Sequence, residues 1–109
     1  MRVVNMTSGD AVVPVNGEMI LLPCQHASPE DYDAWSDALC ESPWRTENIG
    51  GLTVQSRDTT DLLPDPEPGV FYLVNPQDVR GLAGRGDIVQ GGEWNVDVEP
   101  ETCAYLVRV

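Results

Sequence analysis

Lysine is missing from this chain, and its six cationic side chains, all arginines, face eighteen acidic residues. The formal net charge is therefore -12 at pH 7, and the pI lies near 4.1. A protein that binds nucleic acid needs clustered cations to neutralise phosphates. This composition excludes a default nucleic-acid binder, and we expect no direct nucleic-acid contact.

The chain also lacks long apolar runs. None approaches the roughly 20 residues that span a bilayer, and the first ten residues, MRVVNMTSGD, contain no apolar core of a signal peptide. We therefore expect a cytoplasmic protein that does not enter a membrane.

Cysteine is scarce, and its odd count excludes a complete disulfide framework, so we expect reduced thiols. Together, Cys24, Cys40, Cys103 and His26 are a possible Cys3His zinc set. Structural zinc motifs usually supply ligands as close pairs, and only Cys24 and His26 are close, without the two usual intervening residues. The spacing predicts no metal site and no cofactor.

No complete catalytic signature is present. Cys24 and His26 are two residues apart and would share a face of a strand, and Cys40 is another candidate thiol, but no orienting acid or oxyanion loop accompanies them. The glycines of GLAGRGD follow a predicted helix instead of preceding one, which argues against a phosphate-binding loop. We therefore predict a protein that is not an enzyme.

What is present indicates one folded domain. The chain has 109 residues, of which 41% are hydrophobic, enough for a single core. The pattern of several short strands and two short helices predicts an α+β domain with a mostly antiparallel sheet that can curl toward a small barrel.

The strongest hairpin signal is Asn16-Gly17 between two apolar runs. This dipeptide favours a type I′ turn, because both of its central positions need positive φ, and it predicts antiparallel strands over residues 11–15 and 18–22. Pro14 cannot donate a ladder hydrogen bond, so we expect its strand to be an edge or to carry a bulge there.

Residues 29–40 are predicted to form an amphipathic helix. Ser28 is its N-cap, Pro29 suits the first helical position, and Pro43 ends it. At 100° per residue, one face gathers Tyr32, Trp35 and Leu39.

The rest of the chain is predicted from the same signals. Strands are expected near residues 3–7, 51–56, 70–74, 87–90, 93–99 and 104–109, with a loop before the second of these and a turn at the glycine pair 91–92. Asn75-Pro76 should start a short helix that carries Val79 and Leu82 inward and ends at Gly84. The proline-rich acidic arm over residues 57–69 should run extended, without hydrogen bonds.

Part of this pattern resembles a small family of uncharacterised proteins found in tailed bacteriophages and prophages. The resemblance lies in LPDPEPGVFYLVN, in RGDIVQGG and in the N-terminal VVNMT, and it covers about the second half of the chain and residues 3–7. The family usually continues its N-terminal motif into Pro-His, where this chain has Ser8-Gly9, and the helix at 29–40 looks like an addition. The resemblance implies a phage origin and no reaction chemistry.

The acidic residues of the predicted helix suggest a function. Opposite its apolar face it carries Glu30, Asp33, Asp37 and Glu41. Like charges four residues apart destabilise a helix, so this row is simpler to understand if a basic surface meets it. We predict that the protein docks onto a basic surface of a host or phage protein, with further contacts from Trp44, Asp61, Asp65 and Glu67.

Other interpretations stay open. High net charge also promotes solubility, so the row can simply be a solvated face, with Trp44 packed over the helix end. A small-molecule domain can bind an anionic ligand through Arg80 or Arg85, in a pocket between the sheet and the second helix. A virion or assembly component is the third alternative.

Overall fold

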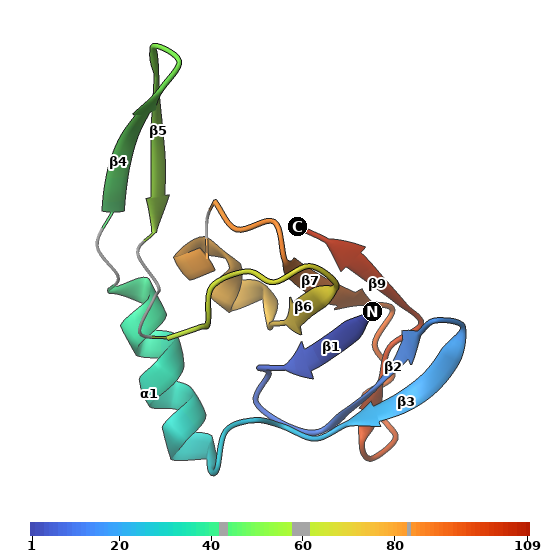
Figure 1. Ribbon diagram of the computed structural model, residues 1–109. Coiled ribbons are helices and arrows are strands. Elements are labelled where there is room, and N and C mark those ends of the chain that lie inside the picture. The colour runs from blue at the N-terminus through green and yellow to red at the C-terminus, as the bar shows by residue number, and fades with distance from the viewer. Residues whose placement is uncertain (42–43, 58–61, 83) are drawn as a thin grey trace.

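The computed structural model describes residues 1–41, 44–57, 62–82 and 84–109 (Figure 1). Its elements follow one another as β1 (Arg2–Asn5), β2 (Ala11–Val15), β3 (Glu18–Leu22), α1 (Pro29–Cys40), β4 (Trp44–Ile49), β5 (Leu52–Arg57), β6 (Val70–Leu73), the 3-10 helix η1 (Pro76–Leu82), β7 (Ile88–Gly92), β8 (Glu101–Thr102) and β9 (Tyr105–Arg108). The predicted α+β class is confirmed. Within the described residues, neither helix is long and apolar enough to cross a membrane.

The strands form three sheets, ordered β1-β6-β7-β9, β3-β2-β8 and β4-β5. Most paired residues belong to the antiparallel ladders β2–β3, β4–β5 and β7–β9, while β1–β6, β6–β7 and β2–β8 are parallel. In the described parts of the chain these sheets do not close into a barrel. The strand predicted near residues 70–74 is β6, which lies inside its sheet and pairs with β1 and β7.

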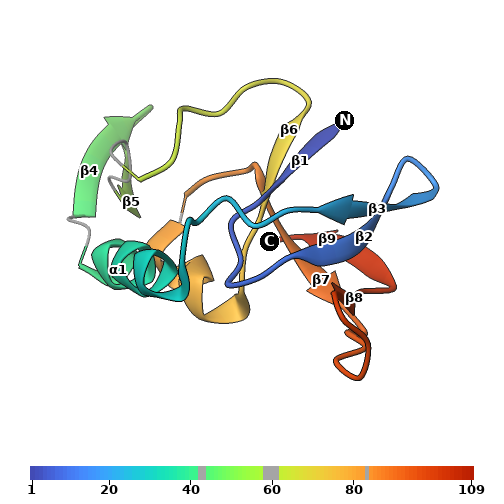
Figure 2. The ribbon, with the colours of Figure 1, turned by 90° about the horizontal axis from the view of Figure 1, so that it is seen from below.

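The four-stranded sheet lies between two apolar cores. Successive residues of a strand point to opposite faces. Accordingly, Leu73 and Val89 pack with β2, whereas Tyr72 and Ile88 pack toward the helices. Figure 2 shows the same layers, with α1 and η1 on one side of β1, β6 and β7, and β2 and β3 on the other. α1 is therefore held by its apolar face against the sheet side that η1 also covers.

The predicted hairpin is confirmed. Val15 pairs with Glu18, and both turn residues have positive φ, 51° at Asn16 and 82° at Gly17. The ladder runs through Pro14 without a bulge, and β8 pairs only with residues 11–12. Pro14 thus lies beyond the reach of β8, where its missing N–H costs no ladder bond.

The prediction of a loop before strand 51–56 is wrong. Residues 44–49 form β4, which pairs along its whole length with β5. Gly50 and Gly51, with φ of 57° and 86°, supply the positive φ of a two-residue turn. Glu47 and Asn48, which have low strand propensity, concealed the strand, and pairing with β5 decides its conformation.

The strand predicted over residues 93–99 is also wrong. Only Asn95 forms a bridge, to Thr102, and Val96 and Val98 are 66% and 43% exposed. The Asn95 side chain accepts a hydrogen bond from the Asp97 amide at 3.1 Å. This local turn competes with strand formation and takes the alternating residues out of the sheet.

The glycine pair 91–92 does not form the predicted turn. Both residues belong to β7 and pair with β9. A Cβ built on Gly92 would lie 2.1 Å from the Tyr105 ring, and one on Gly91 would lie 2.4 Å from the Trp94 ring. The glycines make room for two aromatic rings.

The short helix after Asn75 is confirmed as the 3-10 helix η1, with Leu82 buried and Val79 partly buried, and it ends before the predicted Gly84. The prediction that the arm over residues 57–69 forms no hydrogen bonds is wrong. The Leu62 and Pro64 carbonyls accept hydrogen bonds from the Trp35 and Arg85 side chains. Of the arm's acidic residues, Asp65 and Glu67 are exposed. Asp58 and Asp61 lie outside the described residues, as does Pro43.

Candidate functional site

Helix α1 has the two faces that its sequence predicts. The Ser28 hydroxyl caps it by accepting from the Asp31 amide at 3.1 Å. On its inner face, Tyr32 and Leu39 are buried and Trp35 is partly buried. On its outer face every acidic residue of the row is exposed, namely Glu30, Asp33, Asp37 and Glu41.

A buried polar cluster fixes α1 to η1. The Tyr32 hydroxyl donates to Asp78 Oδ2 at 2.6 Å, and the Ser36 hydroxyl donates to Asp78 Oδ1. The amides of Asn75 and Gln77 donate to the Tyr32 oxygen at 2.9 and 3.0 Å. Burial raises the pKa of Tyr32, and the neighbouring Asp78 raises it further. The Tyr32 proton therefore stays in place as the donor that ties the two elements together.

Sequence reasoning missed this cluster. The side chain at its centre, Asp78, is fully buried. Nothing in the local pattern around residue 78 points to a tyrosine 46 positions earlier. Because no solvent reaches Asp78, its carboxylate orients α1 and is closed to a substrate.

The cysteine and histidine candidates do not meet. Cys103 lies in the core beside β2, and Cys40 is exposed at the end of α1. The Cys24 thiol donates to the Thr7 carbonyl at 3.0 Å, whereas the His26 ring packs on Tyr32 and Trp35 at 5.3 and 5.0 Å. Among the described residues, no group of three His, Cys, Asp or Glu side chains can hold a metal.

One of the two arginines proposed for an anionic ligand, Arg85, already binds groups within the protein. Arg85 donates to both carboxylate oxygens of Asp87, at 3.0 and 2.7 Å, and it also donates to the Pro64 carbonyl. Its side chain is only 11% exposed. Arg80 is exposed on η1. The geometry thus gives Arg85 a structural role and leaves the anionic-ligand interpretation with Arg80 alone.

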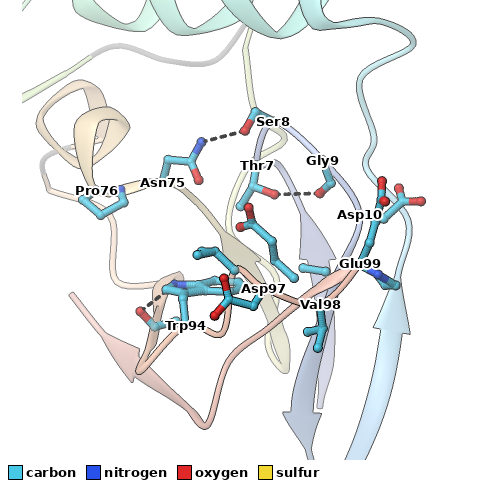
Figure 3. A pocket seen from close by; sticks show the side chains of 15 residues that line it. Thr7, Ser8, Gly9, Asp10, Asn75, Pro76, Trp94, Asp97, Val98 and Glu99 are labelled. Carbon is cyan, nitrogen blue, oxygen red and sulfur yellow. Dashed lines mark hydrogen bonds between the residues drawn. The ribbon is translucent and has the colours of Figure 1, made fainter.

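A groove of about 850 Å³ lies where four segments meet (Figure 3). Its walls come from the turn after β1, the start of η1, the end of β7 and the loop before β8. The apolar lining includes Pro76, Trp94, Val96, Val98 and Pro100, and the acidic lining consists of Asp10, Asp97, Glu99 and Glu101. The described residues that line it include no arginine. The groove borders the second helix, as the small-molecule interpretation expects, but its charge suits a cation.

The β4–β5 hairpin projects beyond the end of α1 (Figure 1). Strand alternation and the register place Ile49, Leu52 and Val54 on one face, where they are 58%, 71% and 43% exposed. Trp44, 52% exposed, lies on the other face. We call Ile49, Leu52 and Val54 the hairpin tip.

Comparisons of the chain with protein-family models, with curated proteins and with solved structures found no match. The resemblance to the tailed-phage family therefore stays a prediction from its sequence motifs.

Proposed function

We propose that this protein is a non-enzymatic, phage-associated accessory protein that binds a basic surface of a host or phage protein through the outer face of α1. The observation that carries the proposal is the exposed acidic row on a helix whose other face is locked to the domain. Within the described part of the chain, Asp33, Asp37 and Glu41 form no ion pair. The helix that carries these carboxylates is held against the domain, and the carboxylates are available to cations of a partner.

The attachment of α1 supports a binding role for the row. An interface gains affinity when its groups need no ordering on binding. The Tyr32–Asp78 bond and the packing of Leu39 fix the orientation of the helix before a partner arrives. Rows of charge on such a surface accelerate association with an oppositely charged protein, and they do so most strongly at low salt.

The hairpin tip adds an apolar part to the proposed interface. It follows α1 directly in the chain, and a lone two-stranded hairpin is only marginally stable in water. Protein interfaces combine an apolar centre with a polar rim. We therefore include Ile49, Leu52 and Val54, on the hairpin that projects beyond the end of α1 (Figure 1), in the proposed interface.

The remaining contacts follow from the sequence prediction. Trp44 is half exposed, and Asp65 and Glu67 are exposed, so we include all three among the proposed contacts. Asp61 belongs to the same proposed surface and lies outside the described residues. The proposed setting is the cytoplasm of an infected bacterium. A virion or assembly role predicts instead that the protein copurifies with particles.

Paired variants test the proposal. In Asp37→Asn/Glu41→Gln the row loses two charges, and the control Glu18→Gln/Glu93→Gln loses two exposed charges elsewhere. Each protein is used to capture partners from a bacterial lysate at low and high salt, and the affinity of every recovered partner is then measured. We expect about tenfold weaker binding for the row variant at low salt, and little change for the control. Unchanged affinity and salt dependence for every partner contradict the proposal.

A further inference from the structure

We propose that the groove bordered by Trp94 binds an arginine-containing segment of another polypeptide. This second binding site does not depend on the acidic row of α1. Its basis is a cavity that one aromatic ring, several apolar side chains and carboxylates line, and the described lining residues include no cation.

The aromatic wall is fixed in position. The Trp94 indole N–H donates to the Gly91 carbonyl at 3.1 Å, and its ring packs so closely over Gly91 that a Cβ there would lie 2.4 Å away. A ring held in this way presents an ordered surface to the groove. Arginine is the side chain that suits it, because its planar guanidinium stacks on aromatic faces and is more weakly hydrated than an ammonium group.

Carboxylates line the groove that this ring borders. Asp97, Glu99 and Glu101 are exposed along the loop that leads into β8. The Asn95 side chain braces the loop by accepting from the Asp97 amide, and the Asn95–Thr102 bridge closes its base. Carboxylates bind a guanidinium with paired hydrogen bonds that its positive charge strengthens, and a neutral or anionic ligand lacks that charge.

On the opposite wall, the acidic side chain of Asp10 already forms a hydrogen bond within the protein. Asp10 Oδ1 accepts from the Cys24 amide at 2.8 Å, and the Thr7 hydroxyl is bonded to Asn5 and Gly9. These bonds shape the turn after β1. The free charge therefore concentrates on the loop side, beside Trp94, as Figure 3 shows for Asp97.

The size and openness of the groove favour a polypeptide over an isolated ion. A volume of about 850 Å³ is far larger than one cation requires. Its exposed apolar residues, Val96 and Val98, suit the side chains that flank an arginine. In the described residues no three ligands converge for a metal. The charge of the groove also repels nucleic acid.

A labelled peptide tests this site. The probe is fluorescein-Gly-Arg-Gly-Arg-Gly-amide, and its Kd is measured by fluorescence anisotropy. We expect Asp97→Asn/Glu99→Gln/Glu101→Gln to weaken binding about tenfold. The charge-matched variant Asp33→Asn/Asp37→Asn/Glu41→Gln should bind the probe nearly as well as the unaltered protein. Replacing both arginines of the probe by citrulline, which has the same shape without the charge, should abolish binding.

Amide chemical shifts of the unaltered protein locate the peptide even if the groove variant fails to fold. We expect shifts at residues 7–10 and 94–101. Unchanged Kd in the groove variant, equal losses in both triple variants, or shifts confined to α1 would each overturn the proposal. Because the two triple variants separate the surfaces, a failure of the α1 interface leaves the groove result intact, and the reverse also holds.

Discussion

The Tyr32 hydroxyl and the Asp78 carboxylate, 46 residues apart in sequence, are joined by a buried hydrogen bond of 2.6 Å. This bond connects α1 to η1, and η1 in turn packs on the four-stranded sheet. The orientation of the proposed binding helix therefore depends on one phenol and one carboxylate, and removing either should disturb the surface that the helix presents.

Replacing Tyr32 by phenylalanine removes one donor to buried Asp78 and keeps the ring. A buried acceptor left without its partner costs about 1–3 kcal/mol, so we expect the free energy of unfolding to fall by that amount. Urea denaturation measures it. The matched control is Tyr105→Phe, which removes the hydroxyl of a residue that is 46% exposed. It should change stability little. Equal stability of Tyr32→Phe and the unaltered protein would show that the bond contributes nothing.

The raised pKa of Tyr32 predicts that the stability of the fold depends on pH. The folded pKa of this residue is raised above the usual value of 10.0, first by burial and then by Asp78. The folded state therefore keeps the Tyr32 proton where the unfolded chain loses it. Its contribution to stability is complete below pH 10 and declines as the pH rises toward the folded pKa. Relative to the unaltered protein, Tyr32→Phe should lose less stability between pH 9 and pH 11 in urea titrations, and parallel losses would contradict this assignment.

Thiol reactivity should follow burial. Cys40 is exposed, whereas burial raises the pKa of the Cys103 thiol inside the core and keeps it protonated. Because the thiolate is the reactive form, iodoacetamide at pH 8 should modify Cys40 first, and Cys103 only after unfolding. Peptide mass spectrometry of native and urea-treated protein shows the order in which the cysteines are modified. Rapid native modification of Cys103 would place it outside the core.

Gly81 should not tolerate a side chain. A Cβ there would lie 2.6 Å from the Leu39 Cβ and 2.9 Å from the Leu39 carbonyl oxygen, so Gly81→Ala must push η1 away from α1. Overpacking of this kind costs about 1–3 kcal/mol. Gly9→Ala, where a Cβ meets no atom within 4 Å, is the control. Thermal unfolding of both variants tests the prediction, and similar midpoints would refute it.

The hairpin tip should matter for binding and not for folding. Ile49→Ser/Leu52→Ser changes two exposed residues, so we expect unfolding free energy to move by less than about 0.5 kcal/mol per residue. Affinity for a captured partner should fall several-fold. Met19→Ser/Leu21→Ser changes an equally exposed apolar pair on β3 and should leave that affinity unchanged. If both double variants weaken binding equally, the tip has no special role.

Local chemistry decided much of this fold in advance. Asn16-Gly17 determines the first hairpin, because few other dipeptides allow positive φ twice. The Ser28 cap and the spacing of Tyr32, Trp35 and Leu39 determine α1 and, with it, the exposure of the acidic row. These features depend on neighbours within a few residues, so a pattern along the chain is enough to find them.

Tertiary structure decided the rest. β4 is a strand because β5 pairs with it, while residues 93–99, whose alternation predicted a strand, are left in a loop where Asn95 closes a turn. Asp78 became a buried acceptor because folding brings Tyr32 to it, and the groove exists only where four distant segments meet. Pairing, burial and enclosure arise between residues that are remote in the chain, so the amino-acid order determined the pieces and their charges, and packing determined which surfaces they present.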